Sequence, residues 1–339
     1  MNNINFDQNK EYDLIALGRA AVDLNANELY TTLEETETFT KYVGGSPANV
    51  AIGMARLNKK TGFIGRVADD QFGNYVLQYF ENEGIDISNM PVDSSGAKTG
   101  LTFTEIKSKT ESSILMYRNE AVDLKLCTDD INEDYIKNSK ALLISGTALS
   151  AEPSRQAALL AVEYAVKNNV KVIFDIDYRP YSWKSEAETG IYYTKVAEKS
   201  DIIIGSRSEF NYMEKIIKEE DRTDKEVAEH WFSFNSKLVV IKHGKEGSTA
   251  YTLEGESYDV KIFPVEMMKS FGGGDAYASA FIYGLLEDWD ILVALEFGSA
   301  SASMLVSAHS CSDAMPTADE IKEFIEEKKK EYGERVVRD

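Results

Sequence analysis

The stretch Phe271-Gly272-Gly273-Gly274-Asp275-Ala276 carries most of the information about the fold of this 339-residue chain. Three consecutive glycines let the backbone approach a ligand closely, with N–H groups pointing outward. The small and apolar residues that follow, up to Phe281, are typical of a helix, and a helix N-terminus carries about half a positive charge. Gly272, Gly273 and Gly274 therefore predict an anion site, most often one for phosphate.

Asp275 is the unusual member of this stretch, because a carboxylate repels a bound anion. Its presence makes sense if it accepts a proton from a hydroxyl that attacks the phosphate. A glycine-rich helix cap without catalytic function is the alternative interpretation, and the stretch alone does not decide between the two.

A second informative stretch is Gly44-Gly45-Ser46-Pro47-Ala48-Asn49. Ser46 is a favourable N-cap and Pro47 a favourable first helical residue. Asn49 would then lie on the first helical turn beside the backbone of Gly44 and Gly45, an arrangement that can hold a polyol. A well-capped helix after a turn is the alternative.

Buried-strand patterns alternate with helical patterns around these two stretches. The strand patterns lie at 12–18, 61–67, 141–145, 170–174, 201–204 and 238–241, and the helical ones at 47–57, 70–83, 153–168, 188–199 and 208–218. This alternation predicts an α/β fold, with a parallel sheet covered by helices on both faces.

Two segments break the alternation. Residues 25–42 are polar and rich in threonine, and residues 99–118 read as a β-hairpin with its turn at 107–111. We interpret both as a small β-sheet that projects from the main domain, as a lid or a dimer surface. Residues 317–332 begin with a capping-box pattern, Thr317 to Glu320, and predict a surface helix.

Composition excludes several classes of function. Lys and Arg number 37 against 57 Asp and Glu, a formal charge of −20, so nucleic acid and anionic membranes are poor partners. No apolar run reaches transmembrane length, and the N-terminus is polar rather than signal-like. The two cysteines and three histidines have no metal-site spacing. We therefore expect a soluble, cytoplasmic protein.

Together, GGSPANVA and KSFGGGDAYAS resemble the two signatures of the ribokinase-like carbohydrate kinases, also called the PfkB family, in the same order along the chain. The resemblance implies one three-layer α/β/α domain at 11–330, with a mostly parallel central sheet. Lid insertions would lie at about 24–43 and 97–120, and an N-terminal tail at 1–10. It also implies ATP-dependent phosphorylation of a sugar hydroxyl, with Asp275 as the catalytic base.

The same resemblance suggests roles for further residues. Asp23 matches the substrate-binding acid of the family, although an ordinary loop acid is the alternative. Glu209 matches an acid that organises Mg²⁺, and Ser206 stands where the family has Asn; both also form an S-x-x-E capping box. The segment from Lys242 through Gly244 to Gly247 resembles the nucleotide loop, with Lys242 in place of Thr, and a surface turn is the alternative.

Two arginines point to an acidic sugar. Arg118 ends the predicted hairpin and Arg179 follows a strand, and arginine pairs well with carboxylate. Members of the family that phosphorylate keto-deoxy sugar acids carry arginines at matching places, and segments such as GRAAVDLNANE and DYRPYSW are similar to one such branch, which acts on a 6-hydroxyl. Salt bridges within the protein are the alternative.

Rival functions remain at this level. They are a kinase for another sugar acid such as 2-keto-3-deoxygluconate, a catalytically silent sensor, and a dinucleotide-dependent dehydrogenase. The dehydrogenase lacks support because no G-x-G-x-x-G follows the first strand. A homodimer through the lid is also plausible. The family often has Asp where this chain has Lys269, near a monovalent-cation site, so we expect weak or absent activation by K⁺.

Overall fold

The computed structural model describes residues 4–108, 111–217 and 222–338, and its largest element is a ten-stranded sheet. Across the sheet the strands are β16 (Val336–Arg338), β15 (Ser257–Val260), β14 (Ser248–Thr252), β13 (Leu238–Lys242), β12 (Ile202–Ser206), β11 (Lys171–Asp175), β10 (Ser139–Ser145), β1 (Tyr12–Leu17), β4 (Thr61–Ile64) and β6 (Asp86–Asn89). The strands from β13 to β6 are parallel, whereas β14, β15 and β16 are antiparallel.

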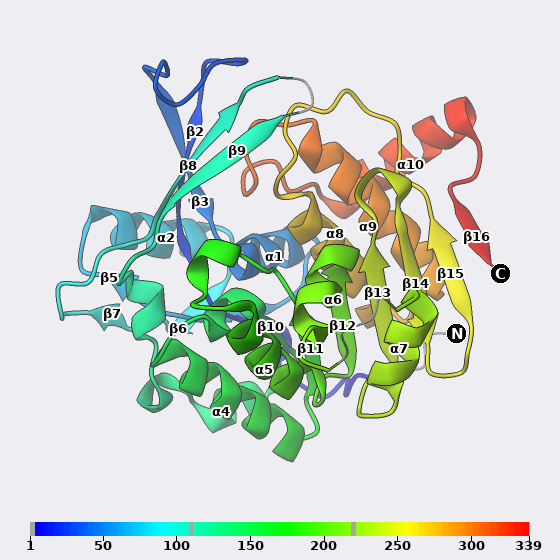
Figure 1. Ribbon diagram of the computed structural model, residues 1–339, viewed down its shortest axis with the longest axis horizontal. Coiled ribbons are helices and arrows are strands. Elements are labelled where there is room, and N and C mark those ends of the chain that lie inside the picture. The colour runs from blue at the N-terminus through cyan, green and yellow to red at the C-terminus, as the bar shows by residue number, and fades with distance from the viewer. Residues whose placement is uncertain (1–3, 109–110, 218–221, 339) are drawn as a thin grey trace.

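Helices cover both faces of this sheet (Figure 1). One layer contains α1 (Ser46–Arg56), α2 (Gln71–Asn82), α8 (Gly273–Leu286) and α9 (Ile291–Val306). The other contains α3 (Glu133–Lys137), α4 (Ser154–Lys167), α5 (Glu186–Ala197), α6 (Arg207–Glu214) and α7 (Asp224–Phe232). Strand side chains alternate between the layers: Leu14 of β1 joins the first core and Ile15 the second. The predicted three-layer α/β/α fold is confirmed.

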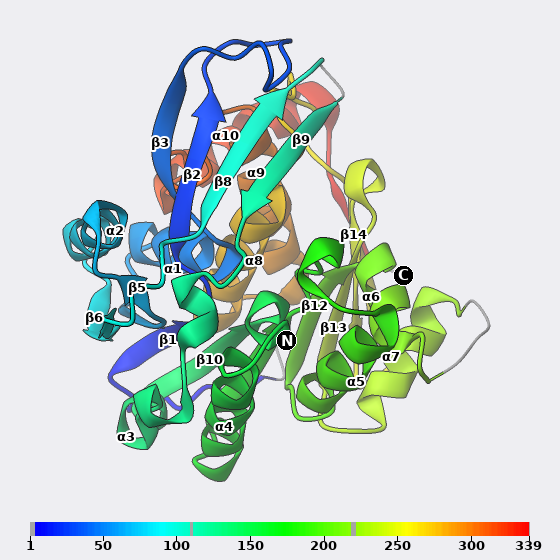
Figure 2. The ribbon, with the colours of Figure 1, turned by 60° about the vertical axis from the view of Figure 1, so that its left-hand side comes forward.

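A second sheet projects from one end of the body (Figure 2). Its order is β3 (Phe39–Gly44), β2 (Ala21–Ala26), β8 (Leu101–Ile106) and β9 (Ser112–Tyr117). We call these four strands the lid sheet. Strands β3, β8 and β9 lie mainly in the two segments that break the α/β alternation, whereas most of β2 precedes residue 25. Strands β8 and β9 form the predicted antiparallel hairpin. Part of its predicted turn, residues 109–110, lies outside the described residues.

Several boundaries differ from those predicted. The apolar run at 61–67 forms β4 and then a separate short strand, β5 (Val67–Ala68), which pairs with β7 (Val92–Asp93). The helix predicted at 208–218 ends at Glu214, and position 218 lies outside the described residues. The helix at the capping box is α10 (Ala318–Tyr332), and Thr317 is its N-cap.

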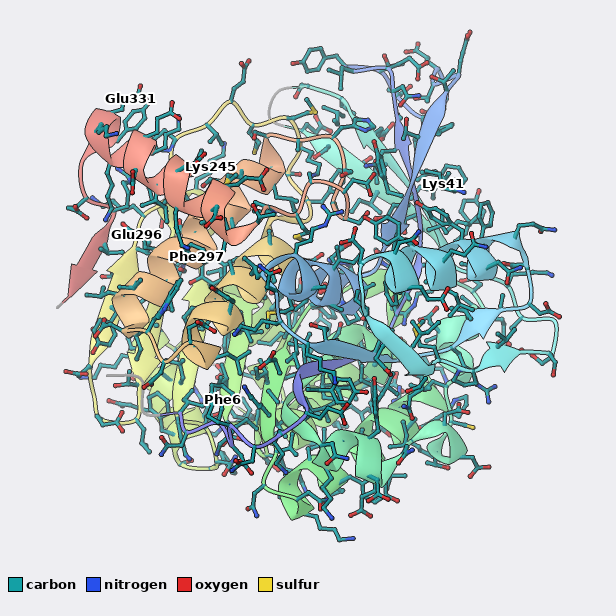
Figure 3. All side chains as sticks on the ribbon, turned by 180° about the vertical axis from the view of Figure 1, so that it is seen from behind. Phe6, Lys41, Lys245, Glu296, Phe297 and Glu331 are labelled. Carbon is teal, nitrogen blue, oxygen red and sulfur yellow. The ribbon has the colours of Figure 1, made fainter. Side chains whose placement is uncertain are left out.

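The antiparallel edge was not predicted, because its short strands are only half apolar. Strand β14 alternates buried and partly exposed residues, and β16 lies beyond residue 330. At the other terminus, Ile4 and Phe6 are buried in the first core, so this part of the predicted tail packs against the body (Figure 3). Among the helices described, none combines the length and apolarity needed to cross a membrane.

Candidate active site

The candidate site lies at the carboxyl edge of the parallel strands. Strands β11, β12 and β13 end there at Asp175, Ser206 and Lys242, and the carboxyl ends of parallel strands are where α/β folds bind ligands. Helices α1 and α8 begin at the same edge. The two glycine-rich motifs, more than two hundred residues apart in sequence, therefore meet in space.

The anion loop, Gly272–Gly274, depends on glycine. Gly272 has φ of 81°, in the left-handed region that side chains disfavour. A Cβ at Gly272 would lie 2.5 Å from the Cys311 Sγ. Helix α8 starts at Gly273, so free N–H groups and the helix dipole converge on the loop as the sequence predicts.

Asp275 lies in the first turn of α8 and contacts the other motif directly. Its Oδ2 accepts a 2.7 Å hydrogen bond from Asn49 Nδ2. Burial, and next the Asp177 carboxylate, raise the pKa of Asp275 to about 6, while hydrogen bonds from Asn49 and Ser46 lower it. A carboxylate in this state can accept a proton near neutral pH.

Ser46 does not cap α1 as predicted. The helix begins at Ser46 itself with Gly45 before it, and no side chain caps it. The Ser46 hydroxyl instead donates to Asp175 Oδ2 at 3.1 Å and also reaches Asp275. The local cap preference is overridden here by two carboxylates from other elements.

Two buried oxygens, one on lid strand β2 and one on helix α1, lack partners among the described residues. Within the described chain, neither Asp23 Oδ1 nor Asn49 Oδ1 has a hydrogen-bond partner, although both atoms are buried. Such atoms cost free energy unless something satisfies them. Burial raises the pKa of Asp23, against the nearby Arg19 guanidinium. Two hydroxyls of a sugar, each donating one hydrogen bond, would satisfy both oxygens.

Both glycines of the first motif are required by close contacts. A Cβ at Gly44 would lie 2.0 Å from Asp23 Oδ1. Gly45 has φ of 108°, and its Cβ would lie 2.2 Å from the Arg19 carbonyl oxygen. Larger residues would therefore displace Asp23 or the chain around Arg19.

Lys242 lies beside the anion loop. A Cβ on Gly274 would be 3.3 Å from Lys242 Nζ. Burial lowers the pKa of Lys242, but the carboxylates of Asp175 and Glu209 outweigh this effect and raise it. The ammonium therefore stays charged next to the predicted phosphate position. Asp175 and Asp177 complete this cluster of charged side chains around Lys242. Neither residue has a predicted role from sequence. Their position directly after the apolar run at 170–174 is the signal that could have indicated one.

The predicted capping box of α6 is present. Ser206 Oγ accepts from Glu209 N at 3.3 Å, and Glu209 Oε2 accepts from Ser206 N at 2.6 Å. Glu209 Oε1 also accepts from Tyr178 N at 3.0 Å. Gly244 and Gly247 both have positive φ in the turn after β13, so this segment has the turn conformation that either interpretation requires.

Each predicted carboxylate-binding arginine already has an acidic partner. Arg118 pairs with Asp123 through Nη2 at 2.6 Å, and its Nη1 donates to Ser182 Oγ at 3.4 Å. Arg179 pairs with Asp177 at 2.7 Å. Arg179 lies close enough to Asp23 and Asp275 to lower the pKa of each. The structure therefore brings Arg179 into the site, and Arg118 contacts the segment that follows Arg179.

The donor set suits a metal ion that arrives with a ligand. Among the described residues there is no group of three His, Cys, Asp or Glu side chains that could hold a metal. Mg²⁺ commonly binds through one or two carboxylates together with substrate phosphates and water. Glu209, beside Lys242 and the anion loop, fits that mode because its oxygens keep lone pairs beyond the two backbone hydrogen bonds.

Comparisons with known proteins agree on one family. Residues 12–318 match the model of the pfkB family carbohydrate kinases. A 5-dehydro-2-deoxygluconokinase from Clostridium tetani is 60% identical over 338 residues, covering 100% of both chains. Among solved structures, a PfkB protein from a Polaromonas species has a TM-score of 0.80 and 27% identity, covering 92% of this chain and 99% of its own.

A more distant structure shares the fold alone. A protein named ribokinase II from E. coli, in complex with ATP and Mg²⁺, has a TM-score of 0.84 at 22% identity, with 93% of this chain and 99% of its own covered.

Proposed function

The chain belongs to the pfkB family of carbohydrate kinases, and from that premise we propose that it transfers the γ-phosphoryl group of ATP to the 6-hydroxyl of 5-dehydro-2-deoxy-D-gluconate. The observation that carries the proposal is the 60% identity, over the full length of both chains, with a relative named for this kinase activity. The site chemistry supports it, because a proton acceptor, an anion loop and unpartnered polar oxygens lie together.

The sugar acid binds beneath the lid sheet. Asp23, the backbone of Gly44 and Gly45, and Asn49 hold its hydroxyls, since the free oxygens of Asp23 and Asn49 face no other partner in the described chain. Arg179 and Arg118 bind its carboxylate by exchanging part of their present ion pairing with Asp177 and Asp123.

Asp275 accepts the proton of the attacking 6-hydroxyl, and Asn49 fixes its orientation through their hydrogen bond. The N–H groups of Gly272–Gly274 and the α8 dipole stabilise charge on the transferring phosphoryl group. Lys242 adds a positive charge at the same place, and Ser206, Gly244 and Gly247 border the nucleotide. When bound, Mg²⁺ held by Glu209 neutralises phosphate charge. Closure of the lid sheet excludes water.

The test is a substrate panel under one ATP-consumption assay. The panel contains 5-dehydro-2-deoxy-D-gluconate, 2-keto-3-deoxygluconate, fructose and ribose. We expect the highest kcat/KM on the first compound, and lower values on both neutral sugars. Activity on fructose or ribose with none on either acid would overturn the carboxylate argument, and preference for 2-keto-3-deoxygluconate would redirect the assignment within the sugar acids.

The outer face of the lid sheet supports a homodimer. Leu115 and Tyr117 are 48% and 60% exposed there. The rings of Phe39, Phe103 and Tyr117 form a continuous row, with centroids 5.5 and 5.6 Å apart. Because β-sheets with one exposed apolar face commonly pair face to face, we infer that two copies associate through this surface. A cytoplasmic location accords with the use of ATP and with two unpaired cysteines, Cys127 and Cys311.

A further inference from the structure

The segment 307–312, directly after α9, contacts both halves of the proposed site. It touches the lid sheet on one side and the anion loop on the other. These contacts come from side chains and backbone atoms whose partners are far away in sequence, so they bring together elements that move separately if the lid sheet opens.

On the lid side, His309 makes the contacts. Its Nε2 lies 2.8 Å from the Ala26 carbonyl oxygen and its Nδ1 lies 3.1 Å from the Tyr42 hydroxyl. A carbonyl only accepts, so Nε2 carries the proton, and in the neutral ring Nδ1 accepts from Tyr42. The backbone carbonyl of His309 also accepts from Asn25 Nδ2 at 2.7 Å. His309 is thus held by both β2 and β3.

Tyr42 connects the contacts of His309 to the proposed sugar site. It is the direct partner of Asp23 in the register of β2 and β3, and directly opposed residues of an antiparallel pair share one face of the sheet. Asp23 and Tyr42 therefore lie side by side on the same face. Any displacement of the strands when a sugar binds Asp23 reaches His309 through its neighbour.

On the loop side, the next two residues make the contacts. The Ser310 carbonyl accepts a 2.8 Å hydrogen bond from Lys269 Nζ, which also donates to the Leu305 carbonyl at 2.9 Å. Lys269 is only 1% exposed and lies three residues before Gly272. Cys311 Sγ occupies the space that a Cβ on Gly272 would need. The position of residues 310–311 therefore constrains the backbone from Lys269 to Gly272, which leads into the anion loop.

A second bridge joins the same two parts. Ser112 at the start of β9 accepts from Ser270 N at 3.0 Å, and the two hydroxyls are 2.6 Å apart. The lid sheet is thus connected to the segment before the anion loop at two places, from β9 directly and from β2 and β3 through His309.

We propose that His309 is a positioning residue that couples the lid sheet to the anion loop, so that sugar held by Asp23 orders Gly272–Gly274 and nucleotide bound at that loop orders the lid sheet. The sugar half of this coupling rests on the proposed function. The nucleotide half does not, because it can be measured without any sugar. Such coupling between two sites is reciprocal.

Hydrogen exchange of the lid strands tests the nucleotide half. Mg²⁺ with a non-hydrolysable ATP analogue is added to the wild type and to the variants His309→Ala, Tyr42→Phe and Phe39→Leu. Phe39 is the matched control, because it lies on the same strand as Tyr42 but its ring contacts Phe103 within the lid sheet. We expect the analogue to slow exchange in β2 and β3 several-fold, about fivefold or more, in the wild type and in Phe39→Leu.

In His309→Ala the protection of β2 and β3 should fall to within about twofold of the free protein, with an intermediate value for Tyr42→Phe. Affinity for the analogue, measured by calorimetry in parallel, shows that each variant is folded and occupied. Equal protection in His309→Ala and the wild type would overturn the proposal, and so would a wild type whose lid strands do not respond to the analogue.

Kinetics test the sugar half. His309→Ala should raise the sugar KM and lower kcat by roughly tenfold each, while the affinity for the analogue without sugar stays unchanged. His309→Gln, which keeps a donor toward the Ala26 carbonyl, should restore part of both; loss without rescue, or a change in analogue affinity alone, would contradict the coupling. The proposed function is judged separately on the wild-type substrate panel, so inactivity there would overturn the function without removing a protection effect.

Discussion

At the scale of single residues, the account depends most on Asp275. Its raised pKa of about 6 has burial as the first cause, and a base works only when deprotonated. We therefore expect kcat/KM to fall as the pH is lowered through about 6, with a slope of one. Ser46→Ala removes a hydrogen bond that lowers this pKa, so its acid limb should move to higher pH. An acid limb near pH 4, unmoved in Ser46→Ala, would contradict the assignment of this environment to the base.

Lys269 stands where the family often has Asp, and its contacts suggest what the ammonium does at this position. Its buried ammonium, between the carbonyl oxygens of Leu305 and Ser310, makes the kind of contact that a bound monovalent cation makes. Burial lowers the pKa of Lys269, yet two carbonyl acceptors favour the charged form. We predict that replacing Na⁺ by K⁺ at constant ionic strength changes kcat by less than about twofold, because mobile cations and a fixed ammonium compete for one place. A several-fold gain with K⁺ would contradict it.

At the scale of elements, the start of α6 combines a helix-capping role of Ser206 and Glu209 with the proposed Mg²⁺-binding role of Glu209, and two variants distinguish these roles. Ser206 and Glu209 cap the helix, so Ser206→Ala should lower the free energy of unfolding by about 1 kcal/mol. It should change the Mg²⁺ concentration for half-maximal rate less than Glu209→Gln does. Glu209→Gln should raise that concentration several-fold in addition to destabilising the helix. Denaturant unfolding and a Mg²⁺ titration of the rate measure the two effects. If both variants lose only stability, Glu209 is a helix cap and no more.

Much of the architecture could be predicted from sequence because its elements are strongly patterned. The central parallel strands are continuous apolar runs such as Ile202–Ile204, and most long helices have clear periodicity. The antiparallel edge was not predicted, because β14 and β16 are short and β14 alternates buried and partly exposed residues. Such strands carry a weak sequence pattern, and they pair because an existing sheet edge is available beside them. Both glycine motifs were found because glycine is itself the signal for a backbone with positive φ, which Gly45 and Gly272 adopt.

Other parts of the site could not be read from sequence, because they depend on contacts between distant segments. Ser46 has the residue type of a helix cap, yet its hydroxyl donates to Asp175. The ion pairs of Arg118 and Arg179 likewise decide where each guanidinium lies. The hydrogen bonds of His309 to Tyr42 and Ala26 join positions more than 250 residues apart. No motif around His309 in the sequence predicts them.

At the scale of the whole molecule, the proposed homodimer depends on the lid sheet. Its exposed Leu115 and Tyr117 give the proposed dimer an apolar contact. We expect light scattering to give a dimer for the wild type and a monomer for the double variant Leu115→Lys with Tyr117→Lys, because two charges would be buried in the contact. Lys322→Ala on α10, outside the lid sheet, is a control. A monomeric wild type, or a double variant that stays dimeric, would contradict this use of the face.

The central claim is that Asp275 is the base of a sugar-acid kinase, and turnover of Asp275→Asn tests it most directly. The substitution keeps the shape and removes the proton acceptor, so kcat on 5-dehydro-2-deoxy-D-gluconate should fall by about 10²- to 10⁴-fold. Calorimetry on the same variant should show the sugar acid and an ATP analogue still bound. A variant within tenfold of the wild-type kcat would contradict the account.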